Sequence, residues 1–109
     1  MRLYNFDLSK HKKIKGELTL QIPPYRERLK MIKDCNFQID DEGKVKVGMD
    51  SVECMINLIN ITEPFFHKLD LKMGDVHVKS LQEAECYSEF DGIITEAASS
   101  ILNAGKLGK

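Results

Sequence analysis

A run of alternating apolar and polar residues, followed at once by two prolines, restricts the fold of this chain more than any other feature. The alternation covers residues 14–22 and predicts a strand with one buried face. Pro23 and Pro24 end that strand because proline has no N–H to give to a sheet, and proline also suits the first turn of a helix. Apolar residues at helical spacing then predict a helix over residues 24–34. The face that it would bury consists of Tyr25, Leu29 and Ile32.

Two hairpins and a capped helix are predicted further along the chain. Alternating runs on either side of a glycine-containing turn cover residues 37–47 and 69–78. Ser80, followed three residues later by Glu83, has the pattern of a capping box. We therefore expect a helix from Ser80 through about residue 88.

Two longer helices are predicted in the centre of the chain and near its C-terminal end. The first starts at a capping Asp50 and ends near Pro64, where a short helical turn follows, and we expect this helix to be well buried. The second covers residues 90–102, with Gly105 as its C-cap, and its small residues favour close packing within the fold. The apolar face of the first helix consists of Val52, Met55, Ile56 and Ile59, with Leu58 and Ile61 beside it.

Together these elements predict an α+β fold in one small domain covering residues 1–109. We expect short antiparallel strands and hairpins packed with three to four helices, and a helical C-terminal half. Residues 1–11 would dock as an arm or short strand, and residues 105–109 would form a mobile tail. We expect neither a membrane span, which needs roughly 20 consecutive apolar residues, nor a secretory signal, which needs an apolar stretch absent from residues 1–15.

No motif of a catalytic or cofactor site is present in the sequence. The chain lacks phosphate-binding glycine loops and the H-E-x-x-H, G-x-S-x-G and C-x-x-C patterns, so we expect no enzyme activity, no catalytic residue and no cofactor. The three cysteines and three histidines lack the close pairs of a zinc site, so no metal is expected, and the thiols would be reduced. One group of carboxylates is interpreted as a solvated helix face: Glu83, Glu85, Glu89 and Asp91.

Charge is unevenly distributed along the chain, although the net charge is only −1. Residues 1–33 hold nine basic and three acidic side chains, a net of +6, whereas residues 34–109 have a net of −7. The basic segment leaves open a nucleic-acid-binding or regulatory function, but the balanced total favours ordinary solvated faces. A further interpretation is head-to-tail self-association of the two halves. The candidate nucleic-acid-binding residues are Lys12, Lys13, Arg26, Arg28, Lys30 and Lys33.

The apolar residues exceed what a domain of this size is expected to bury. Exposed apolar patches of several hundred square ångströms usually mark partner sites, so this excess favours a protein that binds other proteins. The candidate contact residues for a partner are Phe65, Phe66, Phe90, Ile94, Ile101 and Leu102.

The order of these features resembles the small tail assembly chaperones of long-tailed bacteriophages. An early strand leads into an aromatic and basic helix start at residues 25–29, and the central helix ends near Pro64. A glycine turn at Gly74 then leads into the capped helix at Ser80. The last helix changes from acidic to apolar, and the chain ends in a segment rich in glycine and lysine, residues 105–109.

This resemblance implies a protein without a cofactor that acts in the host cytoplasm. Its partner would be the tape-measure protein, whose long helix exposes apolar surface until the tail tube surrounds it. Members of the family often form oligomers, so a homo-oligomer is a possible state. Such a chaperone needs an apolar groove or helix face that holds its partner by helix-in-groove packing.

Overall fold

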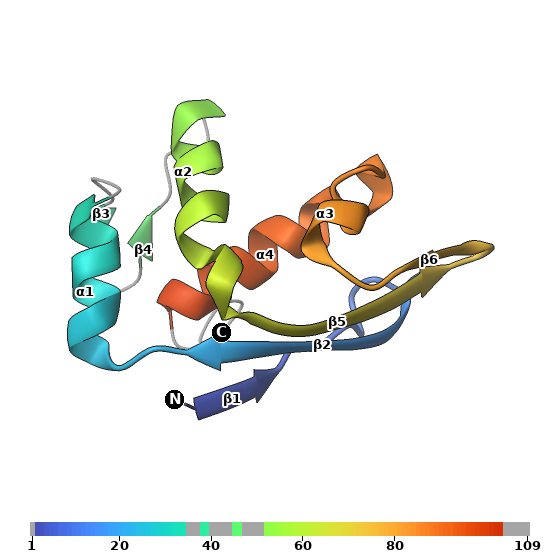
Figure 1. Cartoon of the computed structure of the whole chain (residues 1–109), viewed down its shortest axis with the longest axis horizontal. Coiled ribbons are helices and arrows are strands. Elements are labelled where there is room, and N and C mark those ends of the chain that lie inside the picture. Colours follow the sequence, from blue (N-terminus) through green and yellow to red (C-terminus); the bar gives the residue numbers. More distant parts are fainter. Residues whose placement is uncertain (1, 35–37, 40–44, 47–51, 104–109) are drawn as a thin grey trace.

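A four-stranded antiparallel sheet forms one layer of the molecule, and helices cover one of its faces (Figure 1). The computed structural model describes residues 2–34, 38–39, 45–46 and 52–103. The α+β class predicted from the sequence is confirmed. In spatial order the strands are β1 (Arg2–Asn5), β2 (Lys15–Ile22), β5 (Phe66–Met73) and β6 (Val76–Val78).

The central pair of strands comes from the alternation read in the sequence. Strands β2 and β5 run antiparallel, with Leu18 opposite Leu69 and a register shift between Thr19 and Leu20. Leucines on the same side of both strands are buried, so this face of the sheet packs against the hydrophobic core. The predicted hairpin of β5 and β6 is confirmed, and Gly74 with φ 59° lies at its turn.

The start of the chain is a strand at the edge of the sheet. Strand β1 pairs antiparallel with β2, and Leu3 lies opposite Gln21. The expected arm or short strand within residues 1–11 is therefore a strand over Arg2–Asn5. A separate two-stranded sheet joins β3 (Gln38–Ile39) and β4 (Val45–Lys46). This pairing agrees with the hairpin predicted at residues 37–47, whose loop lies outside the described residues.

Four α-helices and two 3₁₀ turns complete the described part of the chain. Helix α4 lies across the sheet, α2 rises from the sheet beside it, and α1 follows the end of β2 (Figure 1). Their bounds are α1 (Tyr25–Asp34), α2 (Val52–Thr62), η1 (Glu63–Phe65), α3 (Leu81–Ala84), η2 (Ser88–Phe90) and α4 (Asp91–Leu102).

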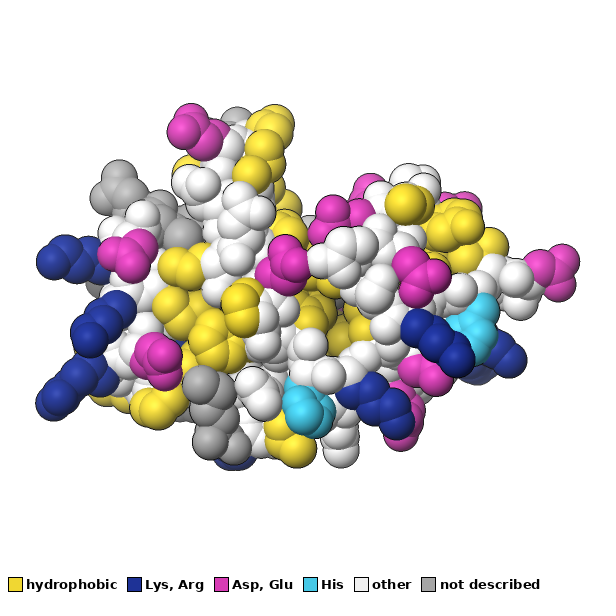
Figure 2. All heavy atoms as spheres, in the orientation of Figure 1, with side chains coloured by type: hydrophobic (Ala, Val, Ile, Leu, Met, Phe, Trp, Pro, Cys, Tyr) yellow, Lys and Arg dark blue, Asp and Glu magenta, His cyan; other side chains and the backbone are white. Residues whose placement is uncertain are grey.

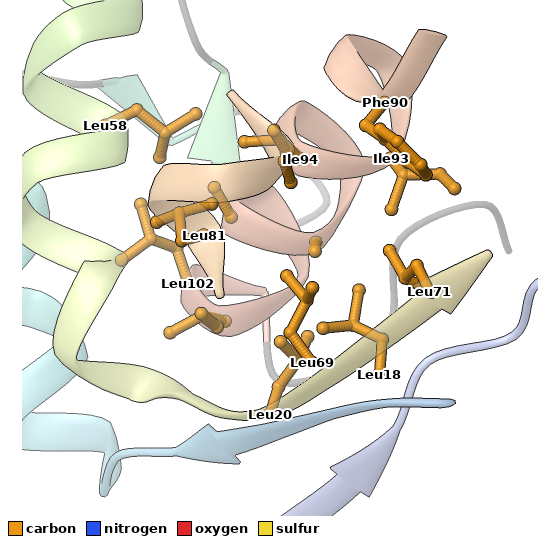
Figure 3. Close-up of a cluster of buried hydrophobic side chains, with 14 of the residues drawn as sticks. Leu18, Leu20, Leu58, Leu69, Leu71, Leu81, Phe90, Ile93, Ile94 and Leu102 are labelled. Carbon is orange, nitrogen blue, oxygen red and sulfur yellow. The ribbon is translucent and has the colours of Figure 1, made fainter. Parts of the chain in front are cut away.

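Helix α4 is the centre of the hydrophobic core. Phe90 and Ile93 at its N-terminal end and Ile101 near its C-terminal end are almost completely inaccessible to solvent. Figure 3 shows Phe90 and Ile93 above the leucines of the sheet. Small residues at Ala97 and Ala98 are also buried, which agrees with the predicted close packing.

Helix α3 is shorter than predicted. Its capping serine is confirmed, because the backbone N–H of Glu83 donates to Ser80 Oγ at 3.1 Å and Glu83 Oε1 accepts from the backbone N–H of Lys79. The helix nevertheless ends at Ala84 instead of near residue 88. The N–H groups of Cys86 and Tyr87 bond three residues back, which tightens the last turn and redirects the chain so that η2 can place Phe90 in the core.

Two predicted helix ends lie outside the described residues. These are the capping Asp50 before α2 and the C-capping Gly105 after α4, together with the expected mobile tail over residues 105–109. Within the described range α4 ends at Leu102, and the N–H of Asn103 donates to the carbonyl oxygen of Ser99 at 3.0 Å.

Candidate protein-binding groove

Four of the six predicted contact residues lie inside the protein. Phe90 and Ile101 are 0% exposed, and Ile94 and Leu102 are buried beside them. Phe90, Ile101 and Leu102 must therefore be removed from the predicted contact surface, whereas the small exposed part of Ile94 lines the groove described below. The physical reason is that α4 covers the sheet directly, so its apolar face is the protein's own core.

The remaining two predicted contact residues are half-buried. Phe65 ends η1 and Phe66 begins β5, and both pack against the core. Both residues lie where the chain passes from α2 through η1 into β5.

Helix α2 exposes apolar side chains that sequence analysis expected to be buried. Val52 is 76% exposed and Ile56 is 54% exposed, whereas Met55 and Ile59 are partly covered. The expectation that this helix is well buried is wrong for that face. The buried residues of α2 are Leu58 and Thr62, so the helix packs against the rest of the protein with the side that carries them. Its apolar residues extend around more of the helix than this side, and the remainder is left uncovered.

A groove of about 550 Å³ lies between this exposed face of α2 and helices α3 and α4. Figure 2 shows apolar side chains at the hollow between α2 and α3. One wall is formed by the α2 residues Val52, Met55, Ile56, Ile59 and Asn60. Ile94 of α4 also contributes to the groove although most of its surface is buried. The lining residues are Val52, Met55, Ile56, Ile59, Asn60, Glu63, Gln82, Glu85, Asp91, Ile94 and Thr95.

Three carboxylates stand around the apolar part of this groove. Glu63 belongs to η1, Glu85 follows α3, and Asp91 begins α4, and all three are exposed. Two of them belong to the acidic face predicted from the sequence, whose four members are all exposed. Gln82 donates a hydrogen bond to the carboxylate of Glu63. The groove therefore combines an apolar wall with an acidic rim.

The candidate nucleic-acid-binding residues do not form one patch. Lys12 and Lys13 precede β2, whereas the other four lie on α1 after β2 has ended. An eight-residue strand spans about 26 Å, so the two groups stand at opposite ends of it. Arg28 is also engaged within the protein, because it donates to the carbonyl oxygen of Pro23 at 2.8 Å and stacks over the ring of Tyr25.

The histidines lie in separate places and each contacts a different partner. His11 Nε2 lies 3.1 Å from Glu96 Oε2, and His77 Nε2 lies 2.6 Å from Asp70 Oδ1. The hydrogen bond from His77 holds the pKa of Asp70 below its ordinary value. Among the residues that the structure describes, no three His, Cys, Asp or Glu side chains are grouped as a metal ion would require.

The Lys68 ammonium is paired across the sheet. Its Nζ lies 2.8 Å from Glu17 Oε2, and this hydrogen bond raises the pKa of Lys68 above its ordinary value. Both side chains are more than half exposed, so the pair is a surface contact of the β2–β5 ladder.

None of the helices in the described ranges is both long enough and apolar enough to cross a membrane. Comparison of the chain with protein-family models, with curated proteins and with solved structures finds no match.

Proposed function

We propose that this protein binds an amphipathic helix of a partner protein in the groove between α2, α3 and α4, and that it catalyses no reaction. The observation that carries the proposal is the exposure of Val52 and Ile56 next to that groove. Covering such side chains lowers the free energy of the system, and a helix with an apolar stripe is a partner that can pack along the apolar wall that α2 provides.

The size of the groove wall sets the length of the partner segment. Helix α2 has eleven residues and is about 16 Å long, so a partner helix lying along it would make contact over about three turns. Complete burial of one Val or Ile side chain contributes roughly 1.5–3 kcal/mol, so a few such residues supply the driving force for binding. Part of this is offset by the loss of translational and rotational freedom on association.

The resemblance to small tail assembly chaperones supports a more specific form of this proposal. In that form the protein is a chaperone of bacteriophage tail assembly, and the partner is the tape-measure protein in the host cytoplasm. The chaperone would cover apolar stripes of the tape-measure helix until tube subunits replace it. Self-association of the chaperone is compatible with this function, since an array of copies would cover a long helix.

The experiment is co-purification with the tape-measure protein encoded in the same genome, using two matched variants. Ile56→Ser changes the groove, whereas Leu3→Ser changes a side chain of equal exposure, 54%, at the far edge of the sheet. We expect Ile56→Ser to weaken binding about tenfold and Leu3→Ser to leave it unchanged, because losing a newly buried aliphatic group costs about 1–2 kcal/mol. Failure of the unaltered protein to retain its partner at micromolar concentration would contradict the proposal.

A further inference from the structure

We infer that the helix held in the groove carries Lys or Arg residues beside its apolar stripe. This inference rests on the proposed function and specifies the chemistry of the partner. It is based on the charges of the groove rim, because the apolar wall alone does not determine which charged residues the partner carries.

The rim presents charge of one sign from three separate elements. Glu63, Glu85 and Asp91 line the groove, and the described residues that line it include no Lys, Arg or His. No ion pair joins any of these three carboxylates to a described basic side chain. The acidic rim is therefore not neutralised by the described part of the protein.

None of the described basic side chains lines the groove itself. Figure 2 shows Lys and Arg gathered at the two ends of this face, over α1 at one end and near β5 and β6 at the other. Lys68 and Lys79 line a neighbouring pocket that shares Glu63 and Gln82 with the groove, and Lys68 is already paired with Glu17. Glu85 and Asp91 line the groove alone. On this face the Lys and Arg side chains are therefore separated from the carboxylates Glu85 and Asp91 that line the groove.

Lys and Arg have the geometry that this arrangement requires. Their aliphatic stems pack along apolar surface while the charged group remains at the edge, so they can cover the α2 wall and reach the rim together. A partner with acidic flanks would bring like charges together at the same rim and would be rejected. The rim would therefore select among amphipathic helices that share the same apolar stripe.

The test uses three synthetic helical peptides of about 14 residues, a length that covers the α2 wall with a turn to spare. They share one apolar stripe and differ only in its flanks, which are Lys, Gln or Glu. Their affinities for the full chain are measured by fluorescence anisotropy at low and high salt. We expect the Lys peptide to bind about tenfold more tightly than the Glu peptide at about 50 mM salt, and the difference to shrink at about 500 mM.

Two variants link this preference to the rim. Glu85→Gln removes a rim carboxylate, and Glu89→Gln removes a nearby exposed carboxylate that does not line the groove. We expect Glu85→Gln to reduce the preference for the Lys peptide by about threefold and Glu89→Gln to leave it unchanged.

The outcomes separate this inference from the proposed function. Equal binding of all three peptides would overturn the charge preference and leave helix binding intact, whereas no binding of any peptide would overturn both. The α1 segment of a second copy is also basic, so self-association is measured by sedimentation in parallel. Self-association that is weakened by Glu85→Gln and blocks the Lys peptide would show that the occupant is a second copy, which would also overturn the inference.

Discussion

Gly16 lies against the backbone of Asp70, so closely that a Cβ at residue 16 would stand 2.0 Å from the Asp70 carbonyl oxygen. Gly16 also has φ 126°, a conformation that side chains with a Cβ rarely adopt. We expect Gly16→Ala to lower the free energy of unfolding by about 2–4 kcal/mol, measured by chemical denaturation. Gly74 provides the control, because its φ is 59° and a Cβ there meets nothing within 4 Å. Gly74→Ala should lower the free energy of unfolding by only about 1 kcal/mol. Equal losses of stability in the two variants would contradict the close approach of β2 to β5 at Gly16.

The second prediction concerns Asp70 and His77 in the β5–β6 hairpin. The hydrogen bond from His77 lowers the pKa of Asp70 from its ordinary value of 3.8. A lowered carboxyl pKa stabilises the folded state at pH values above the ordinary value, and this stabilisation disappears as the pH falls through the lowered pKa. We expect His77→Ala, which removes the hydrogen-bond donor, to raise the Asp70 pKa towards 3.8, measured by carboxyl ¹³C NMR titration. An unchanged titration of Asp70 would show that His77 does not cause the shift.

A third prediction compares two isoleucines with opposite environments. Ile101 is 0% exposed within the core, and Ile56 is on the open face of α2. Ile101→Ala should destabilise the protein by roughly 2–5 kcal/mol, because it removes buried methylene and methyl groups and leaves a cavity. Ile56→Ala should change stability by less than about 1 kcal/mol. Thermal or chemical denaturation of the two variants is the measurement. A larger loss of stability in Ile56→Ala than in Ile101→Ala would place α4 and not α2 at the surface.

The fourth prediction concerns nucleic acid. Since Lys12 and Lys13 are separated from the basic residues of α1 by the length of β2, we expect only weak, non-specific binding of DNA or RNA. The dissociation constant measured by fluorescence anisotropy at about 50 mM salt should be no tighter than about 10 µM. Sub-micromolar affinity that falls steeply with added salt, and that is lost in a Lys12→Ala/Lys13→Ala variant, would favour the nucleic-acid alternative.

The sequence predicted strands and hairpins well because their signals are local. Alternation over residues 14–22 places leucines on one side of a strand whatever packs there, and the turn at Gly74 is specified by a few neighbouring residues. The same is true of the cap at Ser80, which fixed the start of α3. The end of α3 depended instead on where Phe90 had to lie, which is a property of the whole fold.

The candidate site was harder to predict because it depends on which part of each apolar helix is covered. Helical spacing identified the apolar residues of α2 and α4 correctly, but spacing does not say which helix lies against the sheet. The buried Ile94 and the exposed Ile56 are therefore alike in sequence and opposite in structure. The only sequence signal for an outward α2 face is the width of its apolar region, which exceeds what one neighbouring helix covers.

The most direct test of the proposed groove is methyl NMR of the protein during titration with the Lys-flanked helical peptide. We predict chemical-shift changes concentrated on Val52, Ile56 and Ile59, which line the groove, with the methyl signals of Leu3 unchanged. Changes concentrated on β1 or α1, with Val52 and Ile56 unaffected, would contradict the assignment of this groove as the binding site.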